Sequence, residues 1–185
     1  MRVVTGSSKG RQLKAPAGSA VRPTSALVKE SVFSVVQFEV EGARALDLFA
    51  GSGQMGIEAL SRGAGSCVFV DNAKESIAAL RGNLSSAGLF KNAEVIQSDA
   101  VLFLRGYRGK PFDIVFADPP YTSGLLEKVL PLLAGHLSVS AAVFCETGPG
   151  ARLPAEAWGL SLKKQYRYGK TAVSLYRRQE SEQLT

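Results

Sequence analysis

The chain of 185 residues contains one histidine and two cysteines, and this scarcity argues against several kinds of site. A single histidine, His136, allows neither a histidine-based metal cluster nor a Ser–His–Asp triad. Cys67 and Cys145 both lie inside short apolar runs, so we expect two small buried side chains rather than a disulfide framework or metal ligands. We therefore expect no metal.

Long apolar segments are also missing. No run reaches the length of about 18 residues that a membrane-spanning helix requires, and residues 1–6 do not begin a signal peptide. Since 45% of the residues are hydrophobic, the chain can bury one substantial core. These features predict a cytoplasmic protein that does not contact a membrane.

Acidic residues are absent from positions 160–178 and scarce in positions 1–40, although both segments are rich in lysine and arginine. The net charge is +6, and the basic ends flank a nearly neutral middle. This distribution favours a polyanionic partner, above all nucleic acid, with Lys9, Arg11 and Arg22 as candidate phosphate contacts. The alternative is a basic surface that serves only solubility.

From residue 44 onward, short apolar runs alternate with amphipathic segments of helical length. The runs predict strands at 45–48, 67–70, 93–97, 114–117 and 142–145. The intervening segments predict helices at 55–62, 74–87, 100–106 and 124–133, with Gly88 as a C-cap. This alternation is typical of an α/β fold, a parallel sheet with helices on both faces.

The two ends of the chain differ from this pattern. Residues 160–167 and 171–178 read as a C-terminal antiparallel hairpin that closes the sheet. Val28, Val32, Val35 and Val36 share one face of a helix that begins near residues 23–25. We therefore divide the chain into a basic, β-like N-terminal extension (1–22), a main domain (23–178) and a flexible tail (179–185).

The strand at 114–117 runs into Asp118-Pro119-Pro120-Tyr121. Asp118 and the carbonyl group of Pro119 could accept the N–H bonds of an amino group on an aromatic ring, because two prolines leave a turn that presents carbonyl oxygens. Tyr121 could stack on a base taken out of its helix. An ordinary proline-rich turn would explain the same four residues without any chemistry.

The first strand leads through Asp47, Phe49 and Ala50 into a glycine loop containing Gly51 and Gly53. Glycines at this point let the backbone approach a ligand closely. A carboxylate at Asp47 would repel a pyrophosphate but attract the cationic methionine end of S-adenosylmethionine. The loop therefore favours S-adenosylmethionine over a dinucleotide.

Acidic residues also end the second and third strands. Asp71 is placed to bind ribose hydroxyl groups, a requirement that both kinds of cofactor share. Asp99, or the amide of Ala100, could meet the edge of an adenine, although Asp99 could equally be the N-cap of the next helix.

With these residues in place, the chain resembles the class I S-adenosylmethionine-dependent methyltransferases, and more narrowly the RsmD family of 16S rRNA (guanine 966-N2)-methyltransferases. The N-terminal boxes Gly6-x-x-Lys9-Gly10-Arg11 and Arg22-Pro23-Thr24-Ser25 narrow the choice, because other amino methyltransferases share Asp118-Pro119-Pro120-Tyr121. The further matching segments are Asp47–Gly53, Glu58–Ala64 and Tyr168-Gly169-x-Thr171. Two positions depart from the family pattern: Asp71 stands where glutamate is expected, and Lys170 where aspartate is common.

The resemblance implies a Rossmann-like, seven-stranded, mostly parallel sheet. It also implies methyl transfer to the exocyclic N2 of one guanine of 16S rRNA, within an assembled or nearly assembled small ribosomal subunit. Two other functions remain open: a DNA adenine-N6 methyltransferase, against which the lack of an evident target-recognition domain counts, and a non-catalytic rRNA-binding assembly factor. Intact Asp47, Asp71 and Asp118 argue against the last.

Overall fold

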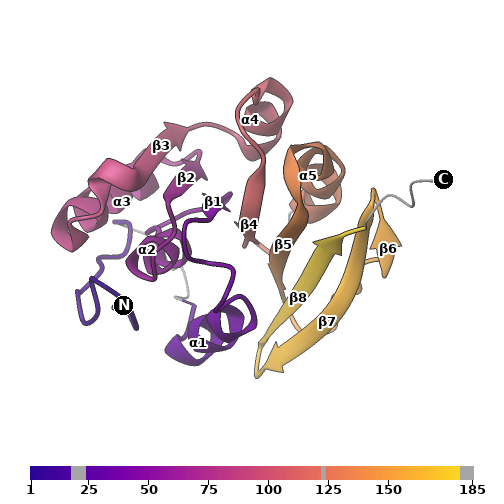
Figure 1. Cartoon of the computed structure of the whole chain (residues 1–185), viewed down its shortest axis with the longest axis horizontal. Coiled ribbons are helices and arrows are strands. Elements are labelled where there is room, and N and C mark those ends of the chain that lie inside the picture. The colour runs from indigo at the N-terminus through magenta and orange to yellow at the C-terminus, as the bar shows by residue number, and fades with distance from the viewer. Residues whose placement is uncertain (18–23, 122–123, 180–185) are drawn as a thin grey trace.

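The computed structural model describes residues 1–17, 24–121 and 124–179. Helices and strands alternate along the main domain, as the sequence pattern predicts (Figure 1). The α-helices are α1 (Ala26–Val35), α2 (Gln54–Ser61), α3 (Lys74–Ala87), α4 (Ala100–Gly106) and α5 (Leu125–Leu133). The strands are β1 (Arg44–Asp47), β2 (Ser66–Asp71), β3 (Ala93–Gln97), β4 (Phe112–Ala117), β5 (Leu137–Thr147), β6 (Glu156–Ala157), β7 (Leu160–Tyr168) and β8 (Thr171–Arg178).

All strands in the described residues join one sheet in the order β3-β2-β1-β4-β5-β8-β7-β6. The first five in this order run parallel, and β8, β7 and β6 continue the sheet in antiparallel fashion. The predicted α/β, Rossmann-like architecture and its C-terminal hairpin are thus confirmed. The two-residue strand β6 was not predicted, because a segment so short carries no alternation of polar and apolar residues.

The helices cover both faces of the sheet and enclose two hydrophobic clusters (Figure 1). On one face, α1, α2 and α3 bury residues such as Phe33, Ile57 and Leu80 against the sheet. On the other face, α4 and α5 bury residues such as Leu104 and Val129. Because both faces are covered, the central strands are apolar throughout, which explains why their sequence shows continuous apolar runs.

Predicted and observed boundaries agree closely for α3, α4, β3 and β8. Gly88 is the C-cap of α3 with a φ of 72°, a conformation that glycine adopts without steric cost. The largest difference is at β5, which begins five residues before the apolar run at 142–145.

In the described residues no helix is long and apolar enough to cross a membrane.

The N-terminal extension folds back on itself through an antiparallel bridge between Arg2 and Gln12. It packs on α1, α2 and α3 rather than projecting from the domain (Figure 1). Residues 18–23, including Arg22, and residues 180–185 of the predicted tail lie outside the described part of the chain.

A buried carboxylate anchors this extension. Glu58 of α2 accepts the backbone N–H groups of Val4 and Thr5 at 2.8 and 2.9 Å. Its carboxylate also meets Arg62 at 2.9 Å and Lys29 at 3.6 Å, and both Glu58 and Lys29 are almost fully buried. Removing one partner from such a buried group is costly, since the remaining charge stays desolvated.

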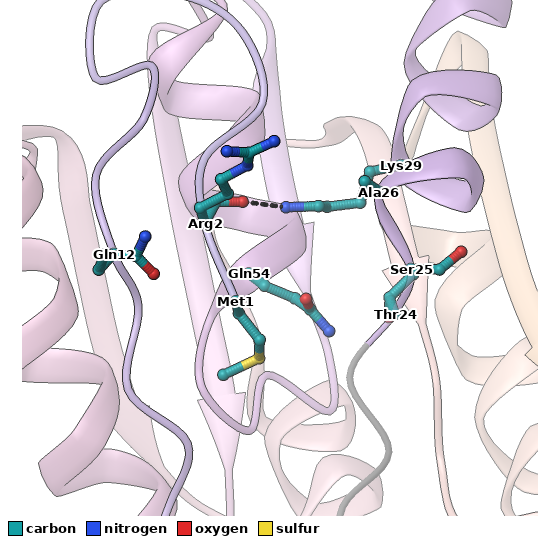
Figure 2. A pocket seen from close by; sticks show the side chains of 8 residues that line it. All are labelled: Met1, Arg2, Gln12, Thr24, Ser25, Ala26, Lys29 and Gln54. Carbon is teal, nitrogen blue, oxygen red and sulfur yellow. Dashed lines mark hydrogen bonds between the residues drawn. The ribbon is translucent and has the colours of Figure 1, made fainter.

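Lys29 completes the connection between α1 and the extension, because its amino group also donates to the carbonyl oxygen of Arg2 (Figure 2). Beside this bond lies a cavity of about 320 Å³, lined by residues of the extension, the start of α1 and Gln54 at the start of α2. The first residues of the chain therefore reach the loop that precedes α2. Burial lowers the pKa of Lys29, and the nearby carboxylate of Glu58 opposes that shift.

Candidate active site

A pocket of about 470 Å³ opens at the carboxyl ends of the parallel strands, where ligands bind in open α/β sheets. Its volume is within the range typical of small-molecule sites. The lining residues follow the ends of five neighbouring strands: Leu48, Phe49, Gly51, Asp71, Asn72, Ser76, Ser98, Asp99, Ala100, Asp118, Pro119, Pro120, Tyr121, Leu125 and Glu146.

The charged side chains among these described lining residues are all acidic. Asp71 and Asp99 lie where β2 and β3 end, and Asp118 and Glu146 lie where β4 and β5 end. Such a lining disfavours a pyrophosphate and suits a ligand with a sulfonium and an ammonium group. The pocket as a whole therefore supports the preference for S-adenosylmethionine over a dinucleotide.

The glycine loop turns from β1 into α2 along the floor of this pocket. Gly51 and Gly53 have φ angles of 52° and 79°, which favour glycine. The turn is tied by the N–H of Gly53 donating to the carbonyl oxygen of Ala50 at 2.6 Å. Of the predicted cofactor residues in this segment, Phe49 and Gly51 line the pocket, whereas Ala50 and Gly53 shape the loop beneath it.

Asp47 lies below the loop and is only 5% exposed. One of its carboxylate oxygens accepts the N–H of Gly56 at 3.0 Å, so it stabilises the first turn of α2. Burial raises the pKa of Asp47 to about 7, the hydrogen bond from Gly56 opposes the rise, and the charge of Asp71 adds to it. Asp47 is not among the residues that line the pocket, and the contact that the structure gives its carboxylate supports the loop.

Asp71 lines the pocket and also fixes two backbone segments. Its two oxygens accept the N–H groups of Gly51 at 2.8 Å and Ala73 at 2.9 Å. A carboxylate has about four acceptor positions, so these bonds leave capacity for ribose hydroxyl groups. Aspartate is shorter than the glutamate that the family pattern has at this position, but the carboxylate of Asp71 still lines the pocket.

Asp99 is the N-cap of α4. Its Oδ1 accepts the N–H groups of Val101 and Leu102 at 2.9 and 3.0 Å. Asp99 and Ala100 also line the pocket, so the cap and the adenine contact are compatible roles rather than alternatives.

The turn after β4 brings Asp118, Pro119, Pro120 and Tyr121 to the opposite end of the same pocket. Desolvation raises the pKa of Asp118 to about 8, and the charges of Glu146 and Asp47 add to the rise. A nearby positive charge would favour the ionised form and reverse part of that shift. The arrangement suits a carboxyl group that ionises more readily when a cationic ligand is bound beside it.

Tyr121 is held at its hydroxyl group although its ring is half exposed. The hydroxyl donates to Oε1 of Glu146 at 2.9 Å and lies 3.2 Å from the hydroxyl of Thr171. Gly148 leaves room for the ring, because a Cβ there would come within 3.2 Å of the tyrosine Cδ2. A fixed, exposed aromatic face next to a carboxyl group has the geometry to stack on a planar ligand.

Glu146 is the functional residue that the sequence patterns missed. It ends an apolar run, Val143-Phe144-Cys145, just as Asp118 ends the run before it. The recurring pattern of an acid at the end of each strand could have identified it, because parallel neighbours end at the same edge of a sheet.

The basic residues near the two ends of the chain lie in different places relative to the pocket. Lys9 and Arg11 are exposed on the N-terminal extension, whose turn contacts Ser61 at the end of α2 farthest from the glycine loop. Lys170 is exposed in the turn between β7 and β8, next to Thr171 and therefore beside Tyr121. Lys170, whose role the sequence left open, is thus placed beside the turn that contains Asp118 and Tyr121.

Neither cysteine has a partner in a disulfide; Cys67 and Cys145 are free and buried, as the sequence predicts. Burial raises the pKa of both thiols, so they are inert at neutral pH. Over residues 1–17, 24–121 and 124–179, no group of three or more histidine, cysteine or acidic side chains is arranged to hold a metal ion.

Comparisons with known proteins find relatives over nearly the whole chain. The family model described as conserved hypothetical protein 95 matches residues 1–177. Protein YlbH of Bacillus subtilis is 40% identical over 182 residues, which span 96% of this chain and 99% of that protein. Ribosomal RNA small subunit methyltransferase D of Escherichia coli K12 is 36% identical, over 97% of this chain and 90% of its own length.

Solved structures show the same architecture. Protein yhhF of Escherichia coli superposes with a TM-score of 0.84 at 34% identity, covering 98% of this chain and 99% of that one. An RNA methyltransferase of Salinibacter ruber shares the fold at a TM-score of 0.67 and 17% identity, over 89% of this chain and 98% of its own. The match of the family model over nearly the whole chain, with the identity to methyltransferase D and the acidic pocket, leads to one assignment: the chain belongs to the RsmD family of methyltransferases and uses S-adenosylmethionine as its cofactor.

Proposed function

We propose that the protein transfers a methyl group from S-adenosylmethionine to the exocyclic N2 of one guanine in 16S rRNA, within the small ribosomal subunit or a late assembly intermediate. The observation that carries the proposal is the turn Asp118-Pro119-Pro120-Tyr121 at one end of the acidic cofactor pocket. The relative named ribosomal RNA small subunit methyltransferase D is similar over 97% of this chain, which supports an rRNA substrate.

The cofactor site is formed by the acidic residues of the pocket. We assign Asp71 to the ribose, Asp99 and Ala100 to the adenine, and the loop at Phe49, Ala50, Gly51 and Gly53 to the methionine end. Asp47 contributes by holding the loop through Gly56. When bound, S-adenosylmethionine supplies an electrophilic methyl group on a sulfonium.

The catalytic turn positions the nucleophile. An amino group on a purine is a weak nucleophile, because its lone pair is delocalised into the ring. Asp118 and the carbonyl oxygen of Pro119 accept its two N–H bonds, which orients the lone pair toward the methyl group, and Tyr121 stacks on the base. Most of the rate enhancement then comes from this near-attack geometry.

The proton balance does not demand a strong base. The nitrogen becomes acidic only after the N–C bond forms and the C–S bond breaks, with the bonding electrons leaving on sulfur. Water then takes the proton, and Asp118 serves as an orienting acceptor throughout. No covalent intermediate with the protein is needed.

The exposed basic residues at both ends of the chain support a ribonucleoprotein substrate. Lys9 and Arg11, with Arg22 outside the described residues, are proposed phosphate contacts that position the particle without reading its sequence. Lys170 lies next to the catalytic turn and suits a phosphate close to the target base. A ribosomal substrate also implies that the protein acts in the cytoplasm.

A methylation assay tests the proposal directly. Small subunits that lack the modification, naked 16S rRNA and DNA are incubated with methyl-labelled S-adenosylmethionine, and the product nucleosides are identified by mass spectrometry. N2-methylguanine from the particles is the expected product. N6-methyladenine from DNA would favour the adenine methyltransferase, and particle binding without methyl transfer would favour the assembly factor.

The variant Asp118→Ala tests the role of the turn. Loss of an orienting acceptor should remove about 2–4 kcal/mol of transition-state stabilisation, or roughly 30- to 900-fold in turnover. Affinity for S-adenosylmethionine should fall far less than turnover, because Asp118 lies at the turn after β4 and not in the glycine loop that we assign to the methionine end. Turnover close to that of wild type would refute the assignment.

A further inference from the structure

Asp118 and Glu146 occupy matching positions on neighbouring parallel strands. Ala117 of β4 pairs in register with Cys145 of β5, and each is followed directly by one of the two acids. Adjacent strands lie about 4.8 Å apart, so the two carboxyl groups leave the sheet side by side. Both line the substrate end of the pocket, and the charge of Glu146 contributes to the raised pKa of Asp118.

The carboxylate of Glu146 is held in a defined orientation. The hydroxyl of Tyr121 donates to its Oε1 at 2.9 Å, and Tyr121 is itself fixed by Thr171. A carboxylate offers about four acceptor positions, so it can accept from more than one donor at once. Glu146 is therefore an acceptor fixed at the edge of the ring on which the base is proposed to stack.

Two acceptors side by side match the edge of one base in particular. Guanine carries the N1–H donor directly beside its N2 amino group. Adenine presents a lone pair at N1 beside its N6 amino group, and cytosine presents a lone pair at N3 beside its N4 amino group. A carboxylate that faces N1 thus gains a hydrogen bond from guanine and meets a repelling lone pair in adenine.

We propose that Glu146 selects guanine by accepting its N1–H while Asp118 and Pro119 accept the N2 amino group. This assignment rests on the proposed function and deepens it, because it names the residue that determines which base is methylated. A site built to bond an N–H group rejects analogues without it far more strongly than an apolar pocket rejects a misfit. The pair Asp118 and Glu146 therefore favours guanine over adenine at the catalytic turn.

The test uses a base that differs from guanine at this edge. 2-Aminopurine keeps the amino group at C2 and replaces the N1–H by a lone pair; it also lacks the O6 carbonyl, so the contribution of N1 is read from the change that Glu146→Gln makes in the preference. Small-subunit rRNA carrying either base at the position that the wild-type protein methylates is assembled into particles, and kcat/KM is measured for both. Wild type should prefer guanine by about 100-fold or more. If the wild-type protein prefers guanine over 2-aminopurine by less than about threefold in kcat/KM, that measurement alone overturns the inference.

The variant Glu146→Gln supplies the second measurement, because an amide can donate to the lone pair of 2-aminopurine. Its activity should fall on guanine and rise on 2-aminopurine, so that the preference shrinks by about 100-fold and can reverse. Calorimetry with S-adenosylhomocysteine, which needs only the cofactor end of the pocket, verifies that the variant is folded.

Tyr121→Phe is the matched control. It removes the hydroxyl that bonds Oε1 of Glu146 but keeps the carboxylate itself, whose place beside Asp118 is set by the pairing of β5 with β4. If Glu146 reads N1, this variant keeps the wild-type preference for guanine over 2-aminopurine even when its rate falls. If both variants shift the preference equally, or neither shifts it, Glu146 only tethers Tyr121 and the inference is wrong.

Failure of this inference differs from failure of the proposed function. A wild-type protein that makes no N2-methylguanine refutes the function. A wild-type protein that makes N2-methylguanine, with a preference that Glu146→Gln leaves unchanged, refutes only the role of Glu146.

Discussion

The hydroxyl oxygens of Tyr121 and Thr171 lie 3.2 Å apart, although 50 positions separate them in the chain. Tyr121 belongs to the turn after β4, and Thr171 is the first residue of β8. The antiparallel hairpin therefore supports the turn that we propose to be catalytic, as well as extending the sheet. This contact gives Thr171, within the segment Tyr168-Gly169-Lys170-Thr171, a physical role.

Thr171→Val should reduce methyl transfer by loosening Tyr121. Loss of one hydrogen bond is worth about 0.5–1.5 kcal/mol, which predicts a decrease of roughly 2- to 13-fold in kcat/KM for the particle. Affinity for the cofactor should not change, because Thr171 does not line the pocket. Thr171→Ser keeps the hydroxyl and should retain most of the activity; equal losses in both variants would contradict this explanation.

Asp71→Ala should weaken S-adenosylmethionine and S-adenosylhomocysteine to the same extent, because both carry the same ribose. The loss should exceed that of a single surface hydrogen bond, at about 1–3 kcal/mol, since Asp71 also fixes Gly51 and Ala73. Calorimetry with both ligands measures it. Asp71→Glu, which keeps the carboxylate, is the control, and unchanged affinities in Asp71→Ala would rule out the ribose contact.

Cofactor binding should depend on pH through Asp118. Burial first, then the charges of Glu146 and Asp47, raise its pKa from the ordinary 3.8 to about 8. Between these values the folded free protein binds a proton that the unfolded chain has released, so this group makes folding less favourable as the pH rises from about 4 to about 8. A bound sulfonium stabilises the carboxylate and displaces the proton.

The affinity for S-adenosylmethionine should therefore increase relative to that for S-adenosylhomocysteine, which lacks the positive sulfur, as the pH is raised from about 6 to about 8.5. Calorimetry at the two pH values gives the ratio of dissociation constants. Asp118→Asn should remove most of the pH dependence of that ratio. A constant ratio in the wild type would show that Asp118 does not feel the sulfonium.

Replacement of Lys9 and Arg11 by alanine should weaken binding to the ribosomal particle. Two lost phosphate contacts predict that the slope of log K against log salt becomes shallower by about 1.4–1.8. Cofactor affinity should not change, since neither residue lines the pocket. Arg108→Ala with Lys110→Ala removes the same charge from exposed positions between α4 and β4 and serves as the control. Equal slopes in the two double variants would make the extension a merely solvated surface.

The main elements of the fold were predictable because their signals are local. The helix over Lys74–Ala87 shows apolar residues at helical spacing and ends at Gly88, and the buried strands are short apolar runs. The positions of Asp71 and Asp118 were predictable for the same reason, because each directly follows such a run, and Asp99 stands two positions after the end of β3.

Contacts between distant segments were not predictable in this way. The sequence near Glu146 does not reveal that β5 lies beside β4 in the register that pairs Ala117 with Cys145. The same holds for Asp47, whose acidity suggested a ligand contact, whereas the structure directs its carboxylate to the N–H of Gly56. The register between strands and the burial of each side chain decide these roles, and neither can be deduced from the sequence of one segment alone.

The anchoring of the N-terminal extension sets an order for folding during synthesis. The partners of Val4, Ser8 and Lys14 are Glu58, Ala87 and Asn83, which the ribosome adds 54 to 79 residues later. Asn83 also bonds the carbonyl oxygen of Ser52, so the same side chain joins the extension to the glycine loop. The segment made first is therefore among the last of the N-terminal half to settle, and its basic surface takes its final shape only together with the cofactor loop.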